Sequence, residues 1–264
     1  MQLQIISDIH LELRNNRYPK IPKKASYIAL LGDIGKPFSS AYKRLIQDLS
    51  KRFEGVIIVA GNHEFYSSVR RKITVRDVRE EIVRIANLYS NVSFLDNNTL
   101  FLEGVRILGC TLWTSIPSDM WSTVRRKMND YHMCYIEKYS DIDVGVPLSP
   151  QHTVFWHDES VAWLKQELSS PGHLNTPTII LTHHCPYHTQ TSHPRYEDNE
   201  LQCCYSTDLS FLFDKPVVAW AYGHTHFPAD QTINGMRLVS NPLGYPDELE
   251  TADSSLKNPP IIIV

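Results

Sequence analysis

The sequence has 264 residues, of which 42% are hydrophobic and 21% are charged, and it carries a net charge of −3 at pH 7. These values are ordinary for a globular protein, and the length suffices for a core that needs neither disulfides nor a structural metal. The slightly acidic balance excludes a global basic field that would attract nucleic acid or anionic membrane. No apolar run approaches the roughly 20 residues that span a bilayer.

Cysteine usage and the first residues bear on the cellular compartment. The five cysteines are an odd number and form no C-x-x-C pair, which fits reduced thiols better than a secreted disulfide framework. The opening stretch "MQLQIISDIH" lacks the basic region and the long apolar region of a signal peptide. We therefore expect a cytoplasmic protein with no membrane partner.

Short apolar runs recur along the chain and predict strands. They occupy residues 3–6, 27–31, 56–60, 105–109, 178–181, 217–221, 236–239 and 261–264. Several runs are continuous rather than alternating, which is typical of strands that are covered on both faces. Between the early runs, residues 39–53 and 75–89 carry apolar side chains at helical spacing, so we expect a helix in each stretch.

A third helix is predicted to begin near residue 150. Ser149 and Pro150 are the residue types that favour an N-cap and a first helical position. The inward face of this helix is expected to hold Val154, Val161, Leu164 and Leu168.

The order of these elements indicates the fold class. Strands and helices alternate early in the chain, which predicts a parallel sheet with covered faces. Further on, Asn234-Gly235 is a hairpin signal. We expect a mixed α/β fold with two packed sheets in a single domain, residues 1–264, because no linker rich in Pro, Gly or Ser divides the chain. Residues 111–150 show few regular periods and should form a long excursion over one face, of a kind that is often functional.

Polar clusters follow five of the predicted strands at the point where each strand ends. They comprise Asp8, His10, Asp33, Asn62, His63, His183, His224 and His226. Since binding sites in open α/β sheets collect beyond the carboxyl ends of the strands, we expect these side chains to meet. Without His63, seven groups remain that suit borderline divalent metals, and they are too many for one ion. Two ions about 3.5–4 Å apart, sharing one carboxylate, would use all seven.

Local patterns favour this site over chance. In Asp8-Ile9-His10 and His224-Thr225-His226, an extended backbone would point both outer side chains to the same side. Glycine in the G-D, G-N-H and G-H-T-H stretches suits a sharp exit from a strand. Each cluster alone has an ordinary explanation, since D-x-H arises by chance, "GNHE" can form a simple turn and His183-His184 can lie on the surface. Their joint occurrence at strand ends indicates a metal site.

The ordered blocks D-x-H, G-D, G-N-H-[DE], an isolated His and G-H-x-H resemble the signature of the calcineurin-like metallophosphoesterase superfamily. All five blocks occur between Asp8 and His226. The resemblance implies a four-layer α/β/β/α sandwich of two mixed sheets flanked by helices, and the activity of a metal-dependent phosphoric ester hydrolase. "MNDY" at 128–131 and "NPLGYP" at 241–246 are similar to a branch of small metallophosphoesterases.

The same resemblance implies ligands and roles. It implies Asp8, His10 and His226 around one metal and Asn62, His183 and His224 around the other, with Asp33 bridging both. His183 is preferred over His184 because the family ligand is the first His after the strand. His63 resembles the family histidine that contacts the scissile phosphate or protonates the leaving group, and orienting Asp8 or Asp33 is its alternative role. Asp33 and His63 are therefore the predicted catalytic residues.

One departure from the superfamily pattern narrows the choice among the branches of the superfamily. Lys36 occupies the place of the second acid in G-D-x-x-D, and the phosphoprotein-phosphatase form G-D-x-V-D-R-G is absent. The resemblance therefore does not extend to the protein Ser/Thr phosphatases, although they share "GNHE".

The predicted function is hydrolysis of a small phosphomonoester or phosphodiester by direct attack of a hydroxide that bridges two divalent metals. Mn, Fe, Zn and Co all suit the mixed nitrogen and oxygen ligands, and Mn is favoured. Asn129 and Tyr131 in the excursion are candidate substrate contacts. A nuclease of the same fold is the alternative, which the lack of a basic surplus disfavours. A non-catalytic metal-binding scaffold is a further alternative, which the complete ligand set disfavours.

Overall fold

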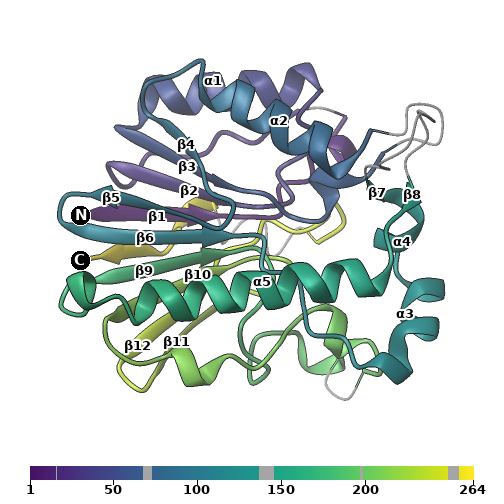
Figure 1. Ribbon diagram of the computed structural model, residues 1–264. Coiled ribbons are helices and arrows are strands. Elements are labelled where there is room, and N and C mark those ends of the chain that lie inside the picture. Colours follow the sequence, from purple (N-terminus) through teal and green to yellow (C-terminus); the bar gives the residue numbers. More distant parts are fainter. Residues whose placement is uncertain (16, 68–72, 137–145, 197–198, 249–255) are drawn as a thin grey trace.

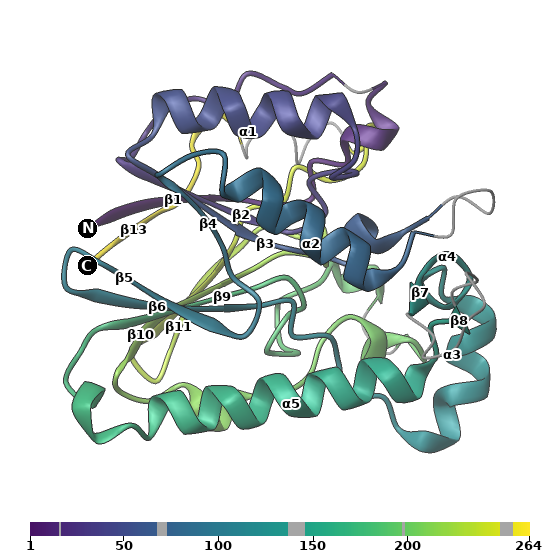
Figure 2. The same cartoon turned by 45° about the horizontal axis from the view of Figure 1, so that its top comes forward.

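The computed structural model describes residues 1–15, 17–67, 73–136, 146–196, 199–248 and 256–264. Two large sheets pack face to face, and helices cover their outer faces (Figure 1). Helices α1 (Ser40–Arg52) and α2 (Val75–Ala86) lie over the first sheet, and α5 (Pro150–Leu168) lies over the second (Figure 2). The four-layer α/β/β/α sandwich expected from the sequence is confirmed.

The first sheet has five strands, of which four are parallel. In spatial order they are β13 (Ile261–Ile263), β1 (Gln2–Ile6), β2 (Tyr27–Leu31), β3 (Gly55–Val59) and β4 (Val92–Phe94). Strands β1 to β4 run parallel, and β13 is antiparallel to β1 at the edge. The early alternation of strands and helices therefore produces the predicted parallel sheet, because a crossover connection returns the chain to the same end of the sheet.

The second sheet has six strands and is mixed. In spatial order they are β11 (Ala229–Ile233), β12 (Met236–Ser240), β10 (Val217–Tyr222), β9 (Thr178–Thr182), β6 (Val105–Cys110) and β5 (Asn98–Leu102). The four central strands are parallel, and β11 and β5 are antiparallel edges. Asn234 and Gly235 join β11 to β12 with φ values of 51° and 83°, which confirms the predicted hairpin.

Alternate residues of one strand face different layers, which explains the continuous apolar runs. In β2, Ile28 and Leu30 pack into the core that also contains residues of α1 and α2. Their neighbours Ala29 and Leu31 pack into the core between the two sheets. A strand that is covered on both faces has no side left for polar residues.

Side-chain caps fix where the helices begin. The Ser39 hydroxyl accepts from the backbone N–H of Tyr42 at the start of α1. Thr74 and Asp77 form a capping box at the start of α2, and Ser149 is the N-cap of α5. Each cap satisfies backbone donors that have no partner inside the helix. The three helices therefore start close to the predicted positions.

The buried face of α5 differs from the prediction. Val154, Val161 and Leu168 are only half-buried. The buried residues of α5 are Pro150, Thr153, His157, Ser160 and Leu164. This stripe is largely polar because its side chains bond to neighbouring loops, as Nδ1 of His157 does with the carbonyl of Leu112 at 3.1 Å. Neither α5 nor any other helix within the described ranges is long and apolar enough to cross a membrane.

The predicted excursion at 111–150 contains short elements of its own. They are α3 (Trp121–Lys127), α4 (Asp130–Met133), β7 (Tyr135–Ile136) and β8 (Val146–Pro147). Strands β7 and β8 form a small antiparallel pair. Figure 1 shows these elements together at one end of the sandwich, away from the N and C termini. This segment therefore adds a wall at the end where β1, β2 and β3 finish.

Strand β13 offers a matched pair of residues for testing the core between the sheets. Ile262 is 2% exposed and packs between the sheets, whereas Ile263 is 72% exposed. Ile262→Ala should lower the free energy of unfolding by about 2–5 kcal/mol because it leaves a cavity. Ile263→Ala should change it by less than about 0.5 kcal/mol. Urea unfolding of both variants measures the difference, and equal effects would contradict the placement of β13.

Candidate metal centre

The predicted ligands lie together at the carboxyl ends of five strands. Asp8 and His10 follow β1, Asp33 follows β2, Asn62 follows β3, His183 follows β9, and His224 and His226 follow β10. In the described part of the chain, three groups of acids and histidines place ligand atoms within 4.8 Å of one another. These groups are Asp8–His10–His226, His10–Asp33–His63 and Asp33–His183–His224. The centre therefore draws on both sheets.

The first cluster is built from the ends of β1 and β10. Nε2 of His226 lies 3.4 Å from Oδ1 of Asp8 and 3.0 Å from Nε2 of His10. Nε2 of His10 lies 3.8 Å from Oδ2 of Asp33. Although burial opposes it, Asp8 and Glu248 raise the pKa of His226 to about 9. A cation that binds here therefore has to displace a proton from this ring.

The second cluster is built from the ends of β3, β9 and β10. Nε2 of His183 lies 3.0 Å from Oδ1 of Asn62 and 3.4 Å from Oδ1 of Asp33. His224 joins Asp33 and His183 in the same group of ligand atoms. Asp33 thus presents Oδ2 to the first cluster and Oδ1 to the second, which is the geometry that a bridging carboxylate requires.

Five of the seven predicted ligands have a left-handed backbone conformation. The φ angle is 54° at Asp8, 49° at His10, 54° at Asp33, 69° at His224 and 51° at His226. Each such residue with a Cβ costs roughly 1–3 kcal/mol, and such strain gathers at functional sites. The D-x-H and H-x-H motifs are therefore not extended, so strand alternation does not explain how their outer side chains meet. The chain turns at each outer residue, and these turns bring the side chains together.

Two glycines allow the strand-end loops to touch. Gly32 has a φ of 83°, and a Cβ there would lie 2.3 Å from Nδ1 of His183. A Cβ on Gly61 would lie 2.2 Å from Oδ1 of Asp33. Any side chain at either position would collide with a predicted ligand. The glycines of the G-D and G-N-H motifs are therefore needed for close approach.

The carboxylate of Glu64 ties two of these loops together. It is buried and accepts the backbone N–H groups of Asp33, Ile34, Gly35 and Gly61 at distances between 2.7 and 3.3 Å. Buried donors need such partners. The acid of "GNHE" therefore fixes the G-D turn against the G-N-H turn, and the position of Asp33 between the two clusters depends on it.

Two further carboxylates hold imidazole rings in place. Oε1 of Glu12 lies 3.2 Å from Nδ1 of His10 and 3.1 Å from Nδ1 of His63. Oε2 of Glu248 lies 2.9 Å from Nδ1 of His226. Carboxylates in this position orient a metal-binding imidazole and make it more basic. Burial opposes ionisation of Glu12, but the hydrogen bonds from His10 and His63 hold the pKa of that carboxyl well below its usual range.

Asp130 fixes the amide of Asn62. The Nδ2 group of Asn62 donates to Oδ1 of Asp130 at 2.7 Å, and the hydroxyl of Tyr66 donates to the same oxygen at 2.7 Å. An amide that donates through its nitrogen presents its oxygen in the opposite direction. Oδ1 of Asn62 is thereby turned toward Nε2 of His183. The excursion therefore supports the second cluster from outside.

The sequence patterns do not predict the supporting role of these four carboxylates. Each lies in or beside a stretch that drew attention there: Glu12 two residues after D-x-H, Glu64 in "GNHE", Asp130 in "MNDY" and Glu248 just after "NPLGYP". An acid adjacent to a ligand motif is the signal that could have found them. Which ring or amide each one holds depends on loop geometry.

The donor set fits divalent cations. Burial lowers the pKa of His183 to about 4 and holds that of His224 well below its ordinary value, so both rings are neutral and offer a lone pair. Nε2 of His224 is buried without a hydrogen-bond partner among the described residues. Burial, followed by the nearby charges of Glu64 and Asp8, raises the pKa of Asp33. A cation between these groups would bind the lone pairs of His183 and His224 and would stabilise the ionised form of Asp33.

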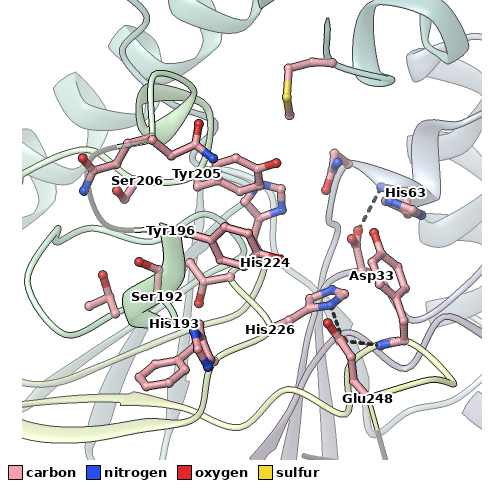
Figure 3. A pocket seen from close by; sticks show the side chains of 18 of the residues that line it. Asp33, His63, Ser192, His193, Tyr196, Tyr205, Ser206, His224, His226 and Glu248 are labelled. Atoms are coloured by element: carbon pink, nitrogen blue, oxygen red, sulfur yellow. Dashed lines mark hydrogen bonds and ion pairs between the residues drawn. The ribbon is translucent and has the colours of Figure 1, made fainter.

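The centre opens into a cavity of about 820 Å³. Figure 3 shows Asp33, His63 and His226 on one side of it, with Tyr196 and Tyr205 across from them. The lining combines aromatic rings with hydroxyl and amide groups and the cations Lys127 and Arg195. It comes from residues 127–129, 191–196, 199–206 and 224–228 and from the tail at 245–248. A space of this size holds far more than a phosphate group.

The two candidate substrate contacts occupy different places. Asn129 lines the cavity. Tyr131 is 5% exposed and is not among the residues that line the cavity. Its hydroxyl lies 3.0 Å from Oγ1 of Thr153 on α5. We therefore do not retain Tyr131 as a substrate contact, because its side chain packs the excursion against α5.

His184 occupies a supporting position beside the second cluster. Its Nδ1 bonds to the carbonyl of Thr111 at 3.1 Å, and its ring packs against Trp113 and His224 with centroid distances of 5.1 and 4.2 Å. His184 belongs to none of the three ligand groups, whereas His183 does. The geometry therefore supports the preference for His183.

Comparisons with known proteins agree with this arrangement. A family model described as calcineurin-like phosphoesterase matches residues 1–228. The chain therefore belongs to the calcineurin-like phosphoesterase family and is a metal-dependent phosphoric ester hydrolase.

Two individual proteins are similar over nearly the whole chain. The uncharacterized protein L509 of Acanthamoeba polyphaga mimivirus is 29% identical over 263 residues, which cover 93% of this chain and 92% of the viral protein. The crystal structure of phosphopantetheinyl hydrolase (PptH) from Mycobacterium tuberculosis matches with a TM-score of 0.69 at 19% identity. That match covers 94% of this chain and 91% of the mycobacterial chain. At this identity the structural likeness establishes the shared fold.

The hydrogen bond between Asp130 and Asn62 gives a testable expectation. Asp130→Ala should free the amide of Asn62 and weaken metal binding at the second cluster by roughly 10–100-fold, while the first cluster keeps its affinity. Titration calorimetry with Mn²⁺ measures both. Asp119→Ala is the control, because Asp119 lies exposed in the same excursion. Unchanged affinity in Asp130→Ala would show that Asp130 does not position Asn62.

Proposed function

We propose that this chain hydrolyses a phosphomonoester or phosphodiester of a small organic molecule with two divalent metal ions, and that Mn²⁺ is the preferred metal. The observation that carries the proposal is that Asp33 lies between two clusters of predicted ligands, with Oδ2 near His10 and Oδ1 near His183. Two ions held this way would supply positive charge to the phosphate oxygens and activate a water molecule. Mixed imidazole, amide and carboxylate donors without thiolates suit Mn²⁺.

The protein's own contribution begins with the position of Asp33. Its backbone is held by Glu64, and its two carboxylate oxygens face different clusters. Oδ1 also accepts the backbone N–H of His63 at 2.8 Å. One residue therefore links the predicted ligand set to His63, so the fold fixes the distance between them.

His63 is placed to serve the leaving group. It lines the cavity next to Asp33, and its ring stacks on Tyr66 with centroids 4.2 Å apart. Its side chain is 15% exposed, so it reaches the cavity while most of its surface packs against neighbouring residues. In the proposed reaction His63 donates a proton to the oxygen of the departing alcohol as the bond from that oxygen to phosphorus breaks.

The cavity supports a substrate with a sizeable organic part. Beyond the ligands it is lined by Tyr196, Tyr205, the cations Lys127 and Arg195 and several hydroxyl and amide groups, and Asn129 lies on its wall. Such a lining can contact rings and polar groups of a substrate, and its cations can contact an additional anionic group. We propose that Asn129 contacts this organic part.

Metal removal and one substitution test the function. Purified protein with Mn²⁺ should hydrolyse 4-nitrophenyl phosphate or its bis-ester, and chelation should abolish the reaction. Asp33→Asn should reduce turnover to background and lower the bound metal, because the shared ligand loses its charge. Single-stranded DNA and a phosphopantetheinyl ester, the group named for the mycobacterial structure, extend the substrate set. Inertness on every ester with metals bound would favour a binding scaffold, and near-normal activity in Asp33→Asn would refute its bridging role.

His63 lies close to His10 and Asp33, and its role can be tested separately from metal binding. His63→Gln should retain both metals, measured by elemental analysis, and should slow kcat on an alkyl phosphate ester by roughly 10²–10⁴-fold because a general acid is lost. His132→Gln is a suitable control, since His132 lies exposed on α4. Loss of metal in His63→Gln would instead make His63 part of the ligand set.

A further inference from the structure

Glu12 stands between two histidines of the centre that have different tasks. It follows the ligand His10 by two residues, on the short turn Leu11–Leu13. One oxygen, Oε1, faces Nδ1 of His10 at 3.2 Å and Nδ1 of His63 at 3.1 Å. The Glu12 side chain is 18% exposed and that of His10 is fully buried. Water therefore competes little for either contact.

These contacts determine which ring nitrogen each histidine presents to its surroundings. An ionised carboxylate can only accept hydrogen bonds, so each ring donates its Nδ1–H to Glu12. Nε2 of His10 is then left to face His226 and Asp33, at 3.0 and 3.8 Å. By the same rule, His63 keeps its proton on Nδ1 and has Nε2 available for exchange with the substrate.

The other contacts of His63 hold its position but do not determine which ring nitrogen carries the proton. Its ring face stacks on Tyr66, whose own ring lies 4.9 Å from Nζ of Lys36. Lys36 also donates to the backbone carbonyl of His63, and the backbone N–H of His63 donates to Asp33. None of these contacts involves a ring nitrogen. Among the described residues, Glu12 is the carboxylate bonded to a ring nitrogen of His63.

We propose that Glu12 is a positioning residue for proton transfer: it fixes His63 with Nδ1–H on the carboxylate and Nε2–H toward the leaving group. This proposal rests on the proposed function. As the bond between phosphorus and the leaving oxygen breaks, its electron pair stays on that oxygen, which takes the proton from Nε2. A water oxygen forms the new bond to phosphorus and releases its proton to solvent. His63 then returns to its charged form by taking a proton from solvent.

The proposal predicts an effect that depends on the leaving group. An alkyl alkoxide is a strong base and needs a proton as it departs, whereas 4-nitrophenolate is a stable anion and needs little help. Loss of the Glu12 carboxylate should therefore slow alkyl esters selectively. A defect in metal binding through His10 would slow both classes of ester together.

The experiment compares Glu12→Gln with the parent enzyme on an alkyl phosphate and on 4-nitrophenyl phosphate, at saturating Mn²⁺. The kcat for the alkyl ester should fall by roughly 10²-fold or more. The kcat for 4-nitrophenyl phosphate should change by less than about threefold and both KM values should stay close to the parent's, because a lost general acid scarcely affects a good leaving group. Glu159→Gln on the exposed face of α5 is the matched control.

A double-mutant cycle separates action through His63 from action through His10. In a His63→Gln background, Glu12→Gln should cost nothing further on the alkyl ester, because the group it positions is already gone. Metal content of each variant is measured in parallel. Equal slowing of both esters, additive losses in the cycle, or loss of metal that accounts for the defect would overturn the proposal.

A measurement on the unsubstituted protein removes any dependence on how the variants fold. Nitrogen-15 NMR of histidine-labelled protein should show the His63 ring protonated at Nδ1, with the signal assigned by its loss in His63→Gln. A ring protonated at Nε2 alone would refute the role of Glu12. Inertness of the parent enzyme on both esters with metals bound would overturn the proposed function itself, and this inference with it.

Discussion

Two carboxylates are buried where the strands of the sandwich end, and their charge is the constraint on which the centre depends. Asp8 is fully buried and Asp33 is 2% exposed, and their ion-pair partners in the described part of the chain are histidines rather than lysine or arginine. Removing such charge from water is costly unless it is paired or coordinated to a cation. The neutral rings of His183 and His224 cannot provide that charge, but they can bind a metal that does. The buried charge of the acids and the neutral rings of His183 and His224 therefore both favour a bound cation.

Four surrounding carboxylates hold the loops and side chains of the centre in place. One acid, Glu64, acts on backbone N–H groups and sets the loops. Three others, Glu12, Asp130 and Glu248, act on the side chains that face the centre. Glu248 lies beyond residue 228, where the family match ends. Its segment is joined to the end of β1 by hydrogen bonds between Ser7 and the backbone of Asn241 and Leu243. The tail is thus an integral wall of the site.

The strands and the ligand blocks could be predicted from the sequence because both follow from simple rules. Continuous apolar runs such as 56–60 mark strands with two covered faces, and polar residues that follow them must meet where parallel strands end. The positions of the four supporting carboxylates follow no such rule. The pairing of Asp130 with Asn62 joins loops 68 residues apart and depends on how the excursion folds.

The departures from prediction have equally local causes. Apolar spacing predicts Val154 and Val161 on the inner face of α5, and both pack half-buried at the margins of the cores. Thr153 and His157 are more deeply buried, because their side chains bond to the Tyr131 hydroxyl and to the carbonyl of Leu112. The alternation of an extended strand does not apply to the D-x-H motif, because Asp8 and His10 both have a left-handed backbone conformation.

The pairing of the first strand with the last governs when the site can be completed. Gln2 in β1 lies opposite Ile263 in β13, so this pairing joins residues from distant parts of the sequence. His226, which follows β10, is likewise distant in sequence from Asp8 and His10, which it meets in the fold. Loop-closure entropy grows only slowly with loop length, so pairing distant strands mainly slows folding and has little effect on stability. Strands that lie far apart in the sequence therefore have to pair before all seven predicted ligands can face one another.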